Sequence, residues 1–145
     1  MIVRDVMTKG AACTPPDASV KDAAGQMKQL DVGALPVCDN DRLVGVVTDR
    51  DIAVRAVAQH MSPDTLVREV MSPHVLYCYE DDDVDQVARN MGENQVRRLP
   101  VLNRSKRLVG IVSLSDLWKE VRPETAVDAV ADISKPGGVH SQTHQ

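Results

Sequence analysis

Hydrophobic and polar positions along the chain predict an ordered series of helices and strands. Extended residues around Ala11–Thr14 are followed by a helix that begins after Ser19, a good N-cap residue, with apolar residues at helical spacing. These apolar residues are Val20, Ala23, Ala24 and Met27. Two apolar runs, Ala34–Cys38 and Leu43–Thr48, then flank a polar turn and predict a hairpin, and Asp49–Ala58 predicts a closing helix.

The same series occurs a second time. An extended stretch at Val75–Tyr79 is followed by a helix that begins after Asp83, by a hairpin of Leu99–Leu102 with Leu108–Ser113, and by a closing helix over Leu114–Val121. A shift of 64 positions aligns the two series with 12 identities in the 35 positions from residue 3 to residue 37. Average residue usage would give about two by chance. The chain is therefore an internal duplication.

Composition narrows the class of protein. The net charge is −4 and the longest Lys/Arg cluster is Arg97–Arg98, which argues against nucleic acid as a partner. No apolar run reaches the ~20 residues of a membrane helix, and the N-terminus lacks the apolar core of a signal peptide, so we expect no membrane association and a cytoplasmic location. Three scattered cysteines predict neither a disulfide framework nor a zinc site.

Motifs that occur twice and in the same order carry a family resemblance. VMT and VMS open the two halves, LPV stands in the middle of each, and LVGVVTDRD and LVGIVSLSD close them. This pattern resembles the CBS-domain family in its tandem arrangement, the Bateman module, of the small stand-alone bacterial type. The resemblance covers roughly Ile2–Val121.

The resemblance implies an α+β fold in which two βαββα units pack sheet to sheet with pseudo-two-fold symmetry. We expect the units at residues 1–62 and 63–123, a short extra helix at 124–133, and a disordered, Gly/Pro-rich tail at 134–145. Family members bind adenosine ligands (AMP, ADP, ATP, sometimes NAD or S-adenosylmethionine) in clefts between the units, form homodimers, and regulate other proteins without chemistry of their own. The expected function is thus a non-catalytic sensor module with no obligatory cofactor.

The candidate ligand residues centre on two Thr/Ser-x-x-Asp motifs. Thr48 with Asp51, and Ser113 with Asp116, stand where a strand passes into a helix. Each pair suits a helix capping box and also a ribose-binding carboxylate beside a hydroxyl, and the two roles do not exclude each other, because unliganded and bound states could use the carboxylate differently. Carried over from the family, one cleft joins Thr48 and Asp51 to Cys78, Arg97 and Arg98. The other joins Ser113 and Asp116 to Thr14, Gly33 and Ala34. The arginine pair favours phosphate in the first cleft.

Alternatives stay open for the arginine pair and for the function. Arg97 and Arg98 could pair with the acidic run Glu80–Asp83, which would close that cleft to anions, and Cys78 replaces the hydroxyl that Thr14 supplies in the first copy. The chain could then be a structural or interaction protein, and a possible unidentified protein partner goes with either function. An enzyme is disfavoured, because no nucleophile–base pair, metal set or phosphate loop is present.

Two further groups of residues are candidates for a metal site and for a disulfide. Asp49 and Asp51 open a helix in different directions without a third ligand, so no metal site is expected there. Cys13 and Cys38 lie on strands expected to be neighbours, where they are either small buried residues or a disulfide that staples the sheet.

Overall fold

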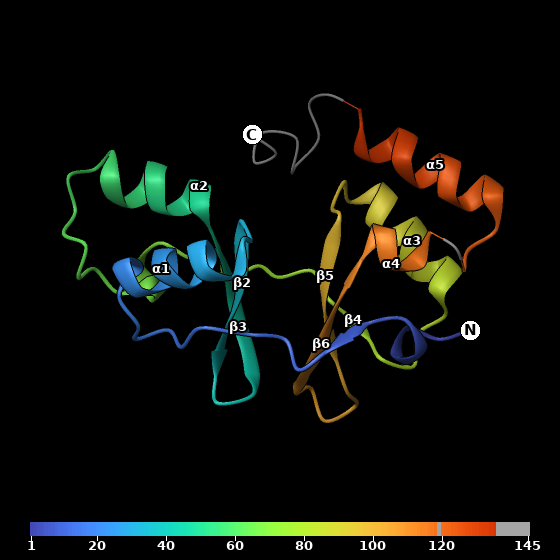
Figure 1. Ribbon diagram of the computed structural model, residues 1–145, viewed down its shortest axis with the longest axis horizontal. Helices are drawn as coiled ribbons and strands as arrows, with labels where there is room; N and C mark the ends of the chain where they lie inside the picture. The colour runs from blue at the N-terminus through green and yellow to red at the C-terminus, as the bar shows by residue number, and fades with distance from the viewer. Residues whose placement is uncertain (119, 136–145) are drawn as a thin grey trace. The chain divides into compact units, whose positions relative to one another are not determined.

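The computed structural model describes residues 1–118 and 120–135 and has a mixed α+β architecture (Figure 1). The chain forms two compact units. The first-repeat unit is Ala12–Val75, and the second-repeat unit combines Met1–Ala11 with the chain from Leu76 onward. No helix in the described part of the chain is both long enough and apolar enough to cross a lipid bilayer.

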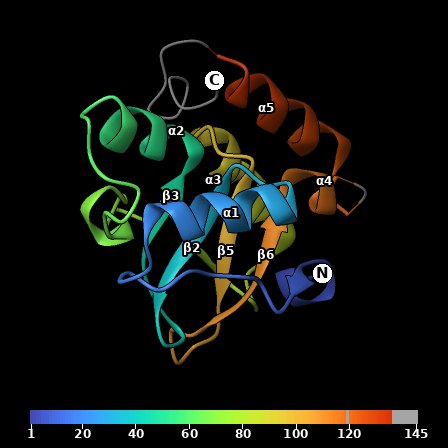
Figure 2. The ribbon, with the colours of Figure 1, turned by 60° about the vertical axis from the view of Figure 1, so that its left-hand side comes forward.

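The first-repeat unit is a two-stranded sheet covered by α1. Its elements are α1 (Val20–Leu30), β2 (Ala34–Asp39), β3 (Arg42–Thr48), α2 (Asp49–Asp51), the π-helix η2 (Ile52–Val57) and the 3₁₀ helix η3 (Val67–Glu69). β2 and β3 are antiparallel, and α1 lies against them in Figures 1 and 2. Ser19 caps α1 by accepting a hydrogen bond from the Asp22 amide (3.0 Å). The buried face of α1 contains Val20, Ala23 and Met27, whereas Ala24 is exposed.

The second-repeat unit is a four-stranded sheet with helices on it. Its elements are η1 (Val3–Asp5), β1 (Thr8–Lys9), β4 (Cys78–Tyr79), α3 (Val84–Glu93), β5 (Arg98–Leu102), β6 (Leu108–Ser113), α4 (Leu114–Leu117) and α5 (Pro123–Ile133). The strand order is β1-β6-β5-β4, with the β5–β6 hairpin at the centre. The core contains Val84, Val87 and Met91 of α3 packed with Leu99 and Val112 of the sheet.

The compact units do not coincide with the sequence repeats, because each repeat gives its lead-in segment to the other unit. Val3, from the start of the first repeat, is fully buried in the core of the second-repeat unit. Val67 and Val70, from the start of the second repeat, are fully buried in the core of the first-repeat unit. The boundaries at 1–62 and 63–123 therefore stay a prediction about the sequence repeats. The two packing units have other boundaries, because one of them is Ala12–Val75.

The closing helices are shorter or less regular than expected. Over Asp49–Ala58, a single α-helical turn passes into the π-helix, in which the Ala58 amide donates to the Ala53 carbonyl (2.9 Å). In the second repeat, α4 ends at Leu117 instead of Val121. Arg122 is extended (φ −64°, ψ 144°) because it precedes Pro123, and the proline then begins α5.

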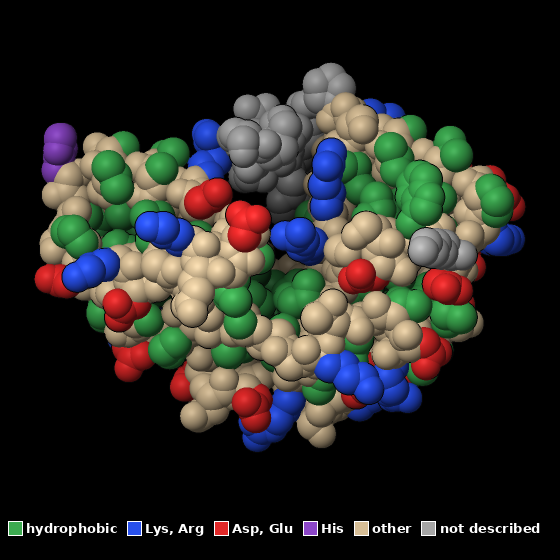
Figure 3. Space-filling model, in the orientation of Figure 1, with side chains coloured by type: hydrophobic (Ala, Val, Ile, Leu, Met, Phe, Trp, Pro, Cys, Tyr) green, Lys and Arg blue, Asp and Glu red, His purple; other side chains and the backbone are tan. Residues whose placement is uncertain are grey.

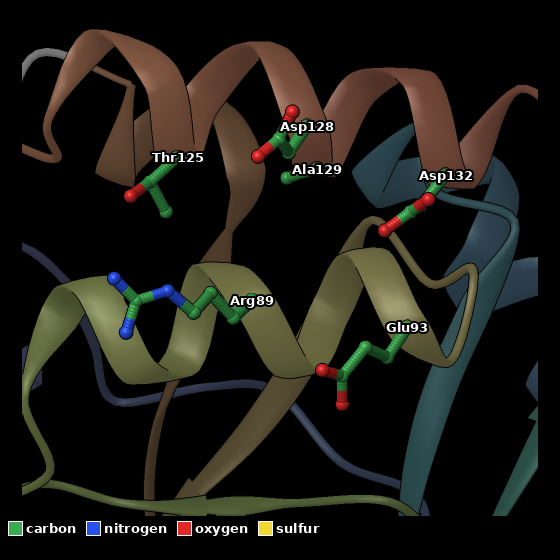
Figure 4. Close-up of a pocket in the computed structure, with 6 residues that line it drawn as sticks. All are labelled: Arg89, Glu93, Thr125, Asp128, Ala129 and Asp132. Atoms are coloured by element: carbon green, nitrogen blue, oxygen red, sulfur yellow. The ribbon is translucent and has the colours of Figure 1, made fainter.

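α5 packs on α3 through its small residues. Thr125, Ala126 and Ala129 are buried, whereas Val127 is 63% exposed, and hydrophobic side chains lie at the surface over α5 in Figure 3. Figure 4 shows the two helices side by side, with Ala129 pointing from α5 toward α3 and a mainly acidic pocket between them. Of the expected disordered tail at 134–145, residues 136–145 lie outside the described residues.

Candidate functional site

The hairpin of the first-repeat unit gathers four of the predicted site residues at one end, which we call the first edge (Gly33, Ala34, Thr48 and Asp51). Ala34 begins β2 and is the cross-strand partner of Thr48, which ends β3. The Asp49 amide donates to the Gly33 carbonyl (2.9 Å) and extends the pairing by one residue. A Cβ on Gly33 would lie 3.2 Å from Asp49 Oδ2, so the absence of a side chain keeps this corner open.

Thr48 and Asp51 form a complete capping box. Thr48 Oγ1 accepts from the Asp51 amide (3.0 Å), and Asp51 Oδ2 accepts from the Thr48 amide (2.9 Å). The other carboxylate oxygen, Oδ1, lies 3.8 Å from Nε of Arg55, and the Asp51 side chain is 16% exposed. The structural role of the motif is thus satisfied, and it uses only one of the two carboxylate oxygens.

The second-repeat unit repeats this arrangement with different neighbours at the second edge (Arg97, Arg98, Ser113 and Asp116). The Ser113 amide donates to Asp116 Oδ2 (2.8 Å), and the Asp116 amide donates to Ser113 Oγ (3.2 Å). Arg98 begins β5 as the cross-strand partner of Ser113, and the Arg97 carbonyl accepts from the Leu114 amide (2.8 Å). Two guanidinium groups therefore stand where the first edge has Gly33 and Ala34.

Arg97 and Arg98 do not pair with the acidic run, so that alternative is wrong. Both arginines are exposed and form no ion pair within residues 1–118 and 120–135. Glu80 instead pairs with Arg4 (Nε–Oε1, 2.8 Å) and Asp81 with Arg104 (Nη2–Oδ1, 2.8 Å).

The rest of the acidic run also has partners inside the second-repeat unit. Asp82 Oδ2 accepts from the Tyr79 amide (2.9 Å), and Asp83 caps α3 by accepting from the Gln86 amide (3.2 Å). The hydrogen bond from Arg104 lowers the pKa of Asp81. Within the described residues, the two arginines of the second edge therefore have no acidic partner.

Thr14 and Cys78 occupy equivalent positions on the inner side of their units. Thr14 is bridged in parallel to Val37, and Cys78 pairs in parallel with Val101. The two residues are only 2% and 5% exposed, so both are buried. Burial and the nearby charge of Asp82 raise the pKa of Cys78 to about 12. Their assignment to the ligand stays a prediction.

Cys13 and Cys38 are neighbours in the first-repeat unit and are free thiols in the structure. The Cys38 amide donates to the Thr14 carbonyl (3.0 Å), which places the residue after Cys13 beside β2. Burial, followed by the charge of Cys13 and a hydrogen bond with its thiol, raises the pKa of Cys38 to about 12. A disulfide between the two therefore stays a prediction.

The structure brings the predicted residues together within each unit. Each edge combines a Thr/Ser-x-x-Asp motif with the first residues of the neighbouring strand, and the expected pairing across repeats, Thr48 and Asp51 with Arg97 and Arg98, stays a prediction. Sequence reasoning missed Arg4, Arg55 and Arg104 as partners of the acidic groups. No group of three or more His, Cys, Asp or Glu residues in the described part of the chain could hold a metal ion.

Two relatives match this chain over nearly its whole length. The CBS domain-containing protein YhcV of Bacillus subtilis is 39% identical over 133 residues, which cover 91% of this chain and 94% of that protein. Hypoxic response protein 1 of Mycobacterium tuberculosis is 36% identical over 135 residues, which cover 92% of this chain and 94% of that protein.

Solved structures share the fold, and some contain bound ligands. Hypoxic Response Protein I, crystallised with two coordinated zinc ions, matches with a TM-score of 0.75 and 35% identity over 84% of this chain and 100% of that one. CBSX2 in complex with AMP matches with a TM-score of 0.67 and 28% identity, covering 92% and 98% of the two chains. The CBS domain pair of MJ0100, in complex with 5′-methylthioadenosine and S-adenosyl-L-methionine, matches with a TM-score of 0.69 and 30% identity over 82% and 94%.

The family assignment follows from the sequence profile. The CBS domain matches twice, at residues 3–57 and 67–117, and these ranges contain both Thr/Ser-x-x-Asp motifs. The duplication, the α+β fold and the relatives agree with this match. The chain therefore belongs to the CBS domain family, as a tandem pair of CBS repeats.

Proposed function

We propose that this protein is a non-catalytic regulatory module that binds an adenosine-containing ligand of the AMP, ADP or ATP type, with the phosphate at the second edge. The observation that carries the proposal is the pair of exposed arginines, Arg97 and Arg98, without ion-pair partners in the described residues and beside Ser113 and Asp116. The ligand-bound structures of CBSX2 and MJ0100 support the class of ligand, because both contain an adenosine derivative.

The residues of the second edge suit the parts of such a ligand. Arginine binds phosphate oxygens in pairs through its planar fork of N–H donors, so Arg97 and Arg98 would hold the phosphate. Asp116 uses Oδ2 for the Ser113 amide, and a vicinal diol would donate to its other oxygen. The arginines would supply the positive charge, because α4 spans only Leu114–Leu117 and its macrodipole is correspondingly small.

The first edge suits a less charged part of a ligand. Gly33 and Ala34 leave the start of β2 without a basic side chain, and Thr48 and Asp51 repeat the hydroxyl and the carboxylate. This edge would take a ribose whose neighbouring group is a base or an uncharged substituent. The two edges would therefore differ in their preference for phosphate.

The test is thermal unfolding of the full chain with AMP, ADP, ATP, NAD and S-adenosylmethionine. A ligand at 100 times its dissociation constant stabilises the protein by about 2.7 kcal/mol, which for a chain of this size raises Tm by roughly 5–10 °C. We expect this rise with AMP, ADP or ATP and expect Arg98→Met to reduce it. The control is Arg42→Met, which removes the same charge at the turn end of β3.

Asp116→Ala completes the test because it removes the carboxylate. This variant also loses its capping box, at a cost of about 1 kcal/mol, so the quantity to compare is the ligand-induced rise and not Tm itself. A ligand effect that is equal in Arg98→Met and Arg42→Met would overturn the assignment to the second edge. No rise with any of the five ligands at millimolar concentration would favour the structural or interaction protein instead.

A further inference from the structure

Arg55 connects the first edge to another part of the first-repeat unit. Its Nε lies 3.8 Å from Asp51 Oδ1, the carboxylate oxygen that the capping box leaves unused. Its Nη1 donates to the backbone carbonyl of Val70 (3.2 Å) and lies 3.5 Å from that of Met71. One guanidinium group therefore touches the candidate ligand carboxylate and the backbone of a segment 15 residues further along the chain.

That segment, residues 70–75, is the last part of the first-repeat unit, and we call it the exit segment. Its beginning is paired with β3, because the amides and carbonyls of Ser72 and Val46 exchange two hydrogen bonds (2.9 and 3.0 Å). A Cβ on Gly45 would lie 2.7 Å from the Ser72 carbonyl oxygen, so the exit segment lies directly on the strand. Beyond Val75 the chain enters the second-repeat unit.

A bound ribose would compete with Arg55 for Asp51. Asp51 Oδ2 is occupied by the Thr48 amide, so a ligand hydroxyl would donate to Oδ1, the oxygen that faces Arg55. A hydrogen bond to Oδ1 weakens the attraction between that oxygen and the guanidinium group. The guanidinium group is also the donor to Val70 and Met71, so a change at Asp51 changes the hold on the exit segment.

The second repeat has no equivalent of this connection. In the alignment of the repeats, Arg55 corresponds to Glu120, and Val70 and Met71 correspond to Val6 and Met7. A carboxylate cannot donate to a backbone carbonyl. Among the described residues, the arrangement is therefore found only in the first-repeat unit.

We infer that Arg55 is a positioning residue that links occupancy of the first edge to the exit segment, and through it to the point after Val75 where the chain enters the second-repeat unit. This inference rests on the proposed function, because it takes Asp51 as a ligand group. It goes beyond that function by naming the segment that responds to the ligand.

The experiment is hydrogen–deuterium exchange of the full chain, measured on peptides that contain residues 70–75. In the ligand-free protein, Arg55→Met should increase the exchange rate there about three- to tenfold, the effect of one lost hydrogen bond. The matched control is Arg68→Met, which removes the same charge from the exposed side of η3, two residues before Val70. We expect this control to exchange like the natural protein.

The second arm adds adenosine, which has a ribose beside a base and no phosphate, at saturation as established by calorimetry for each variant. Adenosine should change exchange in residues 70–75 of the natural protein and of Arg68→Met, but not of Arg55→Met or Asp51→Asn. Equal ligand-free exchange in Arg55→Met and Arg68→Met would overturn the inference, as would adenosine binding with no response in residues 70–75.

The two arms distinguish this inference from the proposed function. If neither the natural protein nor any variant binds AMP, ADP, ATP or adenosine, the proposed function fails and the link to a ligand fails with it. The ligand-free comparison still decides whether Arg55 holds the exit segment. If AMP, ADP or ATP stabilises the natural protein and adenosine binds without an exchange response, the proposed function stands and the inference alone is wrong.

Discussion

The contact between α3 and α5 depends on a glycine, and replacing that glycine should destabilise the protein. A Cβ at Gly92 would lie 2.8 Å from Ala129 Cα, 3.3 Å from Ala129 Cβ and 3.4 Å from the Ala129 carbonyl oxygen. These atoms belong to the backbone or to a methyl group, so no side-chain rotation relieves the clash. Gly92→Ala therefore requires α5 to move away from α3.

The expected loss combines two opposing effects. Overpacking of a tight contact costs about 1–3 kcal/mol. Alanine in a helix interior gains up to about 1 kcal/mol over glycine, and less here because α3 ends one residue later, at Glu93. We therefore expect Gly92→Ala to lower the free energy of unfolding by about 1–2 kcal/mol.

Gly25→Ala is the matched control. Gly25 lies in α1, the helix of the first repeat that corresponds to α3, and a Cβ there would have no heavy atom within 4 Å. The same substitution should raise stability by about 0.5–1 kcal/mol, because only the helix propensity changes. The free energies of unfolding of the two variants should thus change in opposite directions and differ by about 2 kcal/mol.

Urea unfolding provides the assay, with circular dichroism for the whole chain and fluorescence for the second-repeat unit. Trp118 is the sole tryptophan and follows α4 directly, so its emission reports on the unit that contains Gly92. The midpoint of the fluorescence transition should fall in Gly92→Ala. An unchanged or higher midpoint, with Gly25→Ala stabilised as expected, would refute the close packing of α5 on α3.

Three further predictions concern thiols and charges. Mild oxidation with a small-molecule disulfide should join Cys13 and Cys38 in a disulfide bridge and leave Cys78 as the one titratable thiol. The protein should then lose about 2 Da, the mass of the two thiol hydrogens. Three remaining thiols would contradict the bridge. The pKa of Cys78 is raised from 9.0 to about 12. The protonated Cys78 thiol therefore makes its full contribution to the free energy of unfolding below pH 9, and this contribution is lost as the pH rises toward 12. At 1.36 kcal/mol per pKa unit the loss is at most about 4 kcal/mol. Above pH 9, the free energy of unfolding of Cys78→Ala should accordingly fall less steeply with pH than that of the natural protein. Identical pH profiles of the two proteins would argue against the raised pKa. Arg104 lowers the pKa of Asp81, so the pair stabilises the protein above the ordinary pKa of the carboxyl group and loses this effect as the pH falls below it. Arg104→Met should remove this part of the fall of Tm with acid. An unchanged dependence of Tm on acid pH would show that the pair contributes nothing.

The repeat predicted the order of the elements because the same apolar pattern occurs twice. It could not predict that the lead-in segments are exchanged between the units. Val3 and Val67 are identical residues at equivalent positions, so either one fits either core. Side-chain pattern alone does not distinguish packing on the nearer repeat from packing on the more distant one.

The partners of the acidic run were missed for a related reason. Glu80 binds Arg4, which reaches it only because the N-terminal segment belongs to the second-repeat unit. Asp81 binds Arg104, which lies in the β5–β6 turn where the second repeat has its additional residue. Nearness in sequence favoured Arg97 and Arg98, but ion pairs in this unit are set by the sheet topology. The turn and the exchanged segment are two of the features that sequence alone left undefined.

The comparison of the two repeats separates stability from specificity. A capping box stabilises its helix whether or not a ligand is present, so Asp51 and Asp116 alone do not indicate binding. What distinguishes the edges is the neighbouring strand, which begins with Gly33-Ala34 in one repeat and with Arg97-Arg98 in the other. Because both edges share the capping box, the arginine pair is the feature from which we propose that the second edge prefers phosphate.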